Sequence, residues 1–281
     1  MERNFKVGSL AWVAVLAMSG VTAAHADTTT TSTATAPSVQ PRLIDKLTLS
    51  YYGAYFGPSL SDMNANTPGN TPEDDGLQRI ENTITAGYKV TPDVLVGAAF
   101  NFNEMPTRGT GLQLKDPYLK ISNSKAYHNG NFNVYADLRS YAGVTDASKA
   151  KGLVAAFRPN QNITYDIGRL TVGSYSFVKA FVYDSRGAGS NPIYSLVEAP
   201  YANYKLTETV SATMWIDLVQ LTHKHGPAGF LSMTNDPVDV EPGINWDITP
   251  KISINPYINI FPEHASLRSS SIGLIVAAKA L

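Results

Sequence analysis

The chain has 281 residues and a formal net charge of −1, from 22 Lys and Arg against 23 Asp and Glu. This balance argues against a nucleic-acid partner, because proteins that bind phosphate backbones usually carry a basic surplus. With Cys at no position, the sequence excludes disulfides, a lipoprotein anchor and thiolate metal sites. The 21 Gly, 17 Pro and 15 Tyr instead indicate a protein of many strands and turns.

Residues 1–26 show the regions of a secretory signal peptide in order. Arg3 and Lys6 form a basic start, an apolar stretch follows, and Ala24-His25-Ala26 is a small-x-small cleavage site. The apolar stretch is too short to span a membrane comfortably, and an uncleaved amphipathic helix is the alternative. We expect a cleaved signal peptide and export through the inner membrane, followed by a flexible Thr/Ser/Pro-rich periplasmic segment at 27–42.

From residue 43 to residue 281, short turns alternate with longer connections. The short turns are expected at Thr91, His128, Gly168, Thr207 and Thr249, about 40 residues apart. The longer connections are expected at Pro58–Gly76, Asn103–Gln113, Gly143–Gly152, Ser185–Pro192, His223–Asp236 and Pro262–Ser266. Six long loops and five short turns predict about twelve strands, with both termini on the short-turn side.

Within the expected strands, apolar and polar residues alternate. Ile254 and Ile258, for example, point to the opposite face from Asn255 and Tyr257. A soluble β-sandwich would show the same period of two, with its apolar face as the core. The strict alternation of short and long connections favours a transmembrane barrel, in which the apolar face meets lipid and the polar face lines the lumen.

An aromatic residue precedes each short turn by a few positions. Such a ring is typical of the girdle that lies at a membrane interface, where the ring body and the polar tip are both satisfied. The predicted girdle residues are Tyr88, Tyr127, Tyr165, Tyr204 and Trp246.

With its secretory leader, Tyr-rich hairpins and a strand at the extreme C-terminus, the region from Leu43 to Leu281 resembles Gram-negative outer-membrane β-barrel proteins. The resemblance implies an all-β, up-and-down antiparallel transmembrane β-barrel of about 12 strands, with long extracellular loops and short periplasmic turns. It also implies contact with outer-membrane lipid and with the barrel-assembly machinery. Proteins of this class commonly end in an aromatic residue, whereas this sequence ends in Leu281.

The polar face is expected to carry the charges of the interior. In an open pore such charges line a hydrated path and tune ion preference, whereas in a closed barrel they pair and plug it. Twelve strands lie between packed barrels of about eight and open porins of 16–18. The predicted lumen-lining residues are Arg79, Glu81, Lys89, Lys120, Asp137, Arg139, Arg158, Lys179, Glu198, Asp217, Asp239, Glu241 and Asp247.

The leading interpretation is a monomeric outer-membrane pore, or porin, that passes small hydrophilic solutes or ions. The alternative is a plugged structural or surface-interaction barrel that acts through its extracellular loops, of which Pro58–Gly76 is the longest. An enzyme is the third and disfavoured interpretation. The mature chain's four histidines, His128, His223, His225 and His264, are all expected in turns or loops, away from a nucleophilic Ser.

No cofactor and no metal site are predicted. His223 and His225 are two residues apart on an expected loop, but a third ligand is not visible. The acidic run Thr71–Gly76 lacks the ligand spacing of a Ca²⁺ loop. Both stretches are interpreted as solvated loops.

Overall fold

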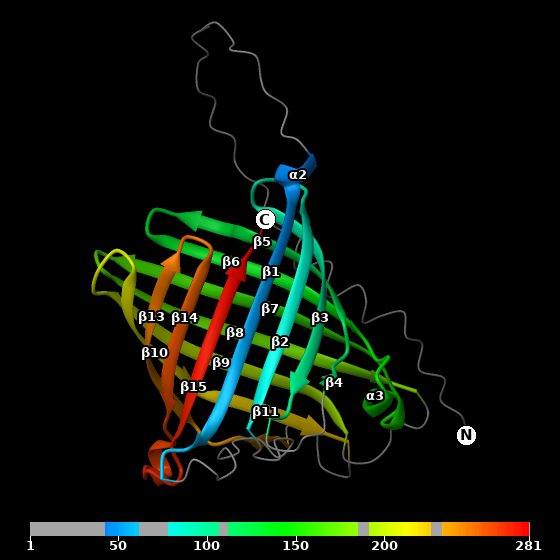
Figure 1. Ribbon diagram of the computed structural model, residues 1–281. Helices are drawn as coiled ribbons and strands as arrows, with labels where there is room; N and C mark the ends of the chain where they lie inside the picture. The colour runs from blue at the N-terminus through cyan, green and yellow to red at the C-terminus, as the bar shows by residue number, and fades with distance from the viewer. Residues whose placement is uncertain (1–42, 62–77, 107–111, 185–190, 226–231, 281) are drawn as a thin grey trace, which may run out of the picture. The chain divides into compact units, whose positions relative to one another are not determined.

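A single antiparallel sheet closes on itself to form the wall of the molecule (Figure 1). The computed structural model describes residues 43–61, 78–106, 112–184, 191–225 and 232–280. The first strand pairs with the second and with the last, and the ring continues without a gap through pairing of β9 with β10 and of β10 with β13. The predicted signal peptide and the 27–42 segment lie outside the described residues.

Long strands make up almost all of the described chain. They are β1 (Leu47–Ser59), β2 (Arg79–Lys89), β3 (Val94–Glu104), β4 (Leu112–Leu114), β5 (Tyr118–Asn129), β6 (Phe132–Ala142), β7 (Leu153–Ile167), β8 (Leu170–Tyr183), β9 (Pro192–Lys205), β10 (Val210–Asp217), β11 (Val219–Lys224), β12 (Thr234–Asn235), β13 (Asp239–Thr249), β14 (Ile252–Asn259) and β15 (Ser271–Lys279). The short helices are α2 (Leu43–Lys46), α3 (Asp146–Ala150) and the 3-10 helix η1 (Pro262–His264).

These strands form a closed barrel of twelve. Strands β4 and β5 both pair with β3 and are two parts of one barrel strand, as are β10 and β11, which both pair with β9. Strand β12 is a two-residue addition to β11. The predicted fold class and strand number are therefore confirmed. Among the described residues, no helix is long and apolar enough to cross a membrane.

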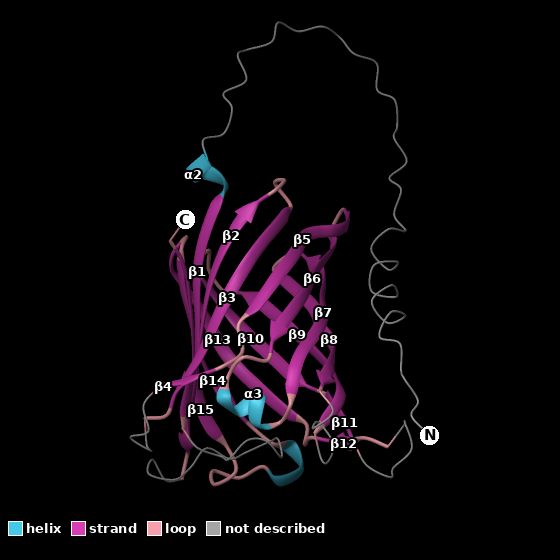
Figure 2. Cartoon of the chain, turned by 90° about the vertical axis from the view of Figure 1, so that its right-hand side faces the viewer, coloured by secondary structure: helices cyan, strands magenta, loops and turns pink. Residues whose placement is uncertain are grey.

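The tight turns lie at the end of the barrel where the chain also enters and leaves it (Figure 2). Gly130 and Gly168 stand in two of them with φ of 57° and 61°, the left-handed region that such hairpin turns require. The last strand closes the barrel at this end, where Ala280 N donates to Leu49 O at 2.8 Å. Tight turns lie at or within about two residues of the five predicted positions; the turn predicted at His128 is formed by Gly130 and Asn131, after the end of β5.

Longer connections lie at the opposite end, and one of them is ordered by capping. Thr145 caps α3 by accepting a hydrogen bond from Ser148 N. The Asp116 carboxylate accepts from the backbone N of Val144 and Thr145 at 3.0 and 3.1 Å. Parts of the other predicted long loops, at 62–77, 107–111, 185–190 and 226–231, lie outside the described residues.

Burial is inverted relative to a soluble sandwich. Large apolar side chains such as Leu119 (67% exposed) and Phe100 (45%) face outward, whereas Asp137 (1%) and Asp239 (0%) are buried inside. A soluble protein would place these residues the other way round. The alternation of faces predicted from the sequence is confirmed, and the sandwich interpretation is wrong.

One polar residue on the outer face has a local explanation. Asn82 points outward from β2 and is only 5% exposed, because the Tyr51 side chain covers it and donates to its Oδ1 at 2.7 Å. Tyr51 reaches it across Gly53, where a Cβ would lie 2.4 Å from the Tyr51 hydroxyl oxygen. The glycine is required here for close approach, and it lets an aromatic ring screen an amide from lipid.

Candidate functional site: the interior of the barrel

The predicted girdle residues gather on the outer face near the tight turns. Tyr88, Tyr127, Tyr165, Tyr204 and Trp246 are between 37% and 50% exposed. Register places Tyr88 opposite Leu47, the first residue of β1, and Tyr165 opposite Phe132, the first residue of β6. This placement is that expected of an aromatic belt at a membrane interface.

Twelve of the thirteen predicted lumen residues project from the inner face, on the evidence of strand register. Lys89 and Asp247 stand near the tight turns, at the mouth of the barrel. Of the other ten, Arg79 and Glu81 pair with each other on β2, and Asp137 pairs with Arg139 on β6. Arg139 and the remaining six form two surfaces of opposite sign. We call them the basic wall, on β5–β8, and the acidic wall, on β10 and β13.

Four cations form one row across the basic wall. Register pairs Lys120 with Arg139 and Arg139 with Arg158. The β7–β8 register places Arg158 opposite Lys179, because it runs from Phe157 opposite Ala180 to Asn160 opposite Phe177. Residues opposite each other on neighbouring strands lie about 5 Å apart. Like charges are therefore held next to one another along the whole row.

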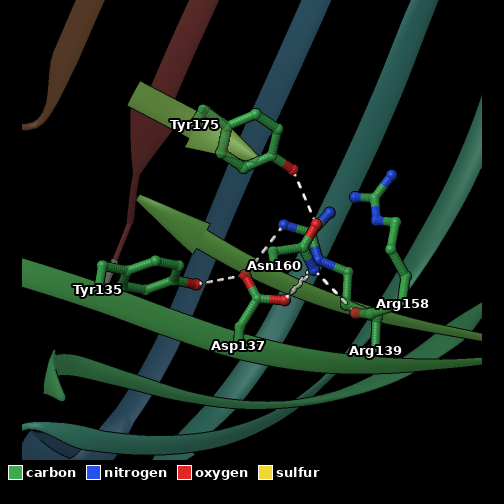
Figure 3. Close-up of polar contacts among 6 residues, drawn as sticks. All are labelled: Tyr135, Asp137, Arg139, Arg158, Asn160 and Tyr175. Atoms are coloured by element: carbon green, nitrogen blue, oxygen red, sulfur yellow. Dashed lines mark hydrogen bonds and ion pairs between the residues drawn. The ribbon is translucent and has the colours of Figure 1, made fainter. Parts of the chain in front are cut away.

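A single carboxylate beside this row is fully engaged (Figure 3). Asp137 accepts from Arg139 Nε at 2.8 Å and Nη2 at 3.2 Å, from the Tyr135 hydroxyl at 2.8 Å and from Asn160 Nδ2 at 2.7 Å. The Tyr175 hydroxyl in turn donates to Asn160 Oδ1 at 2.8 Å. The Asp137 carboxylate therefore accepts hydrogen bonds from one cation, Arg139, and from two neutral donors.

Aromatic rings hold two of the remaining cations. The Arg158 guanidinium carbon lies 4.6 Å from the centre of the Phe177 ring and 5.7 Å from that of Tyr141. Lys179 Nζ lies 4.6 Å from the centre of Tyr141 and 4.8 Å from that of Phe181. Contacts of this geometry stabilise a cation without neutralising it.

The acidic wall repeats the arrangement with the opposite sign. Asp217 and Asp239 are direct cross-strand partners, and Glu241 is opposite Trp215. Asn259 Nδ2 donates to Asp239 Oδ2 at 2.8 Å and to Glu241 Oε1 at 3.5 Å. A barrel closed by ion pairing would interleave the two signs, whereas here one strand, β9, separates two walls of opposite charge.

Part of the interior has room for water. Tyr52 points inward from β1, since its register partner is Thr83 on the inner face of β2, yet it is 44% exposed. The Glu81 side chain is 45% exposed while paired with Arg79 at 2.9 Å. Side chains can be this accessible inside a barrel wall only where the interior is not filled.

Glu198 is the one predicted lumen residue that the structure places elsewhere. Its register partners are Ser176 and Val219, and it shares a face with Tyr204, six positions along β9. The Ser174 hydroxyl donates to its Oε1. Glu198 therefore projects from the outer face, and its assignment to the lumen is wrong.

This outward carboxylate lies deep in the apolar belt. Six residues at about 3.3 Å each along a strand tilted by about 45° place it about 14 Å from the level of Tyr204, near the middle of a band about 25 Å tall. We expect Glu198→Leu to stabilise the barrel in lipid by up to about 2 kcal/mol, because it removes an ionisable group from hydrocarbon. Guanidinium unfolding in lipid vesicles measures this. A loss of stability in Glu198→Leu would show that lipid does not surround this residue.

Two histidines also lie where the sequence did not predict them. His128 lies within β5, which continues past the girdle residue Tyr127 to Asn129. His223 lies within β11, which continues to Lys224, into the range predicted as a loop. The His223 ring stacks on Tyr194 with centroids 5.1 Å apart, and its Nδ1 lies 2.5 Å from Ser232 O. His225 contacts the Tyr183 ring by its edge. Within the described ranges, no group of three or more His, Cys, Asp or Glu could hold a metal ion.

The sequence prediction also omitted the aromatic lining of the interior. Tyr52, Tyr118, Tyr141, Tyr175 and Phe177 project into the lumen with the charged residues. These rings carry no charge, but they alternate with apolar outward residues in the same way as Arg139 and Arg158, and that alternation also predicts the inner face for them.

No protein-family model matches the chain, and no curated protein matches it in sequence. Solved structures match across 83% of the chain. One is an outer membrane channel from Pseudomonas putida F1, with a TM-score of 0.51, 10% identity and 94% of that chain covered. Others are OmpF from Salmonella typhi (TM-score 0.39, 6% identity, 96% covered) and outer membrane phospholipase A from Escherichia coli (0.41, 10%, 89%).

At these identities the similarity concerns the fold. The chain has the fold of an outer-membrane β-barrel protein, as the sequence predicts.

Proposed function

We propose that the protein is an outer-membrane pore that passes small hydrophilic solutes or ions through the barrel interior. The observation that carries this proposal is the accessibility of inward-facing side chains at mid-strand, above all Tyr52 at 44%. Lipid meets the apolar outer face, and water meets the charged inner face.

The separation of charges supports an open interior over a plugged one. In a plugged barrel, acids and bases pair across the lumen. Here Arg79–Glu81 and Arg139–Asp137 each join residues two positions apart on one strand. The rival interpretation relies on the extracellular loops, and 62–77, most of the longest one, lies outside the described residues.

The proposal includes a location and an orientation. The barrel lies in the outer membrane after removal of the signal peptide, its assembly relies on the barrel-assembly machinery, and no cofactor or nucleic acid takes part. The tight turns at Thr91 and Gly168 are proposed to face the periplasm, as in barrels with short periplasmic turns. The predicted extracellular loops Pro58–Gly76 and His223–Asp236 lie partly outside the described residues.

Reconstitution in planar lipid bilayers tests the proposal. An open lumen gives stepwise conductance that increases with salt concentration. A correctly refolded barrel that adds no conductance would contradict the pore and support the plugged scaffold.

The acidic wall should bias this conductance toward cations. Replacing Asp239 and Glu241 by Asn and Gln retains hydrogen-bonding capacity toward Asn259 but removes two charges, so cation preference should fall. The shift in reversal potential under a salt gradient should be larger at low salt than at high salt, because salt screens the field. An unchanged reversal potential would show that the acidic wall does not influence permeating ions.

A further inference from the structure

The row of four cations in the basic wall lowers the stability of the barrel, because neighbouring like charges repel one another. Strands of a sheet lie about 4.8 Å apart, and like charges directly opposite one another are destabilising. The row Lys120, Arg139, Arg158 and Lys179 repeats this juxtaposition across four strands. An acid at any one of these positions would relieve it. The row lies on the inner face of the barrel, and this position indicates that it interacts with a solute that enters the lumen.

Two of the four cations in the row have no carboxylate partner among the described residues. Asp137 pairs with Arg139, while Lys120 and Arg158 form no ion pair with any residue that the structure describes. Arg158 Nε is buried and has no hydrogen-bond partner within the described ranges. Its guanidinium stands apart from the Asp137 network (Figure 3). A buried donor without a partner in the chain requires an acceptor from outside it, such as a water molecule or an anion.

The contacts of Arg158 prepare it for a carboxylate. Its guanidinium lies over the Phe177 ring at 4.6 Å, and a guanidinium that stacks on a ring keeps its in-plane N–H donors free. Those donors match the two oxygens of a carboxylate in a bidentate pair. Lys120 and Lys179, in the same row, add positive charge on either side along the wall.

The rings that accompany the cations indicate an organic anion. Tyr141, Phe177 and Phe181 lie beside Arg158 and Lys179, and their edges offer apolar surface next to the charged groups. A carboxylate with an apolar body gains from that surface, whereas inorganic phosphate does not. The acidic wall lies on the other side of β9, and its charges would disfavour a second negative charge on the solute.

We propose that the basic row on β5–β8 is a binding site for small organic monocarboxylates within the lumen, with Arg158 as the principal anion ligand. Passage of such solutes through the barrel rests on the proposed pore function. Binding of a monocarboxylate to the row does not require that the barrel conduct ions.

Isothermal titration calorimetry of the refolded protein with benzoate tests the site. We expect saturable binding to the wild type and a loss of about tenfold in affinity for Arg158→Gln, because a bidentate charged pair is removed. Lys89→Gln is the matched control: it also removes one inward cation, but at the mouth of the barrel, and it should bind benzoate like the wild type. Unfolding in guanidinium provides a second measurement. Arg158→Gln should be at least as stable as the wild type, because it relieves like-charge contacts.

The outcomes separate the two proposals. Benzoate binding that depends on Arg158 in a barrel that gives no bilayer conductance would retain the site and overturn the pore. Stepwise conductance without saturable benzoate binding would retain the pore and overturn the site. Equal affinity of the wild type and Arg158→Gln would also overturn it. Inorganic phosphate that binds as tightly as benzoate would overturn the organic class of the ligand.

Discussion

Asp137→Ala should destabilise the refolded barrel by about 3 kcal/mol, because it leaves Arg139 and two neutral donors without their shared acceptor. The cost of breaking a buried ion pair by removing one partner is about 3–5 kcal/mol. The lower end applies here, since the Arg139 side chain retains 19% exposure and the lumen can hydrate it. Guanidinium unfolding in detergent or lipid measures the change.

Glu81→Ala is the matched control for this prediction. It removes a carboxylate from a pair of the same type, two residues apart on one strand, but Glu81 is 45% exposed. An exposed pair contributes about 0–1 kcal/mol. Equal losses for Asp137→Ala and Glu81→Ala would contradict the description of Asp137 as the buried centre of a network.

Ile258→Arg should cost about 2–4 kcal/mol, because it places a cation on the outer face close to the middle of the bilayer. Ile258 is 39% exposed on the outer face of β14, opposite Ile272 on β15. Refolding into lipid vesicles followed by denaturant unfolding measures the loss.

Two controls separate the face from the depth. Ile254→Arg lies on the same face but at the level of Trp246, its register partner, so it should cost only about 0–1 kcal/mol. Asn255→Arg points into the lumen, where its amide now contacts Thr213 at 3.3 Å, and it should also cost little. Equal penalties for Ile258→Arg and Asn255→Arg would contradict the assignment of the two faces.

Much of the barrel could be predicted from the sequence because its signals are local. Alternation with a period of two fixes which face each residue of β6 or β14 occupies, and turn residues such as Gly168 fix where a hairpin reverses. The twelve strands and five short turns follow from those two signals.

The errors arise where a local signal is mixed. On β9 both faces carry polar residues, so the charge of Glu198 alone predicts a position in the lumen. Its even spacing from Tyr204, an outward aromatic, gives the correct face. His128 and His223 were expected in turns or loops because hydropathy weakens where strands extend past the membrane belt.

The charged walls could not be predicted from single strands. The row of Lys120, Arg139, Arg158 and Lys179 exists only through the register of four strands, and the pairing of Asp217 with Asp239 crosses a long loop. A sequence shows near-balanced charge in the lumen, whereas the pairing of strands separates it into two surfaces.

A water-filled lumen at the level of Tyr52 is the central claim, and a cysteine placed there tests it directly because the chain has no other. In planar bilayers, a charged, membrane-impermeant thiol reagent should react with Tyr52→Cys and reduce the current in steps. The reagent should not change the current through Val276→Cys, because residue 276 is opposite Gly53 on the outer face. A folded Tyr52→Cys barrel whose thiol does not react with the reagent, and whose current does not change, would contradict the account.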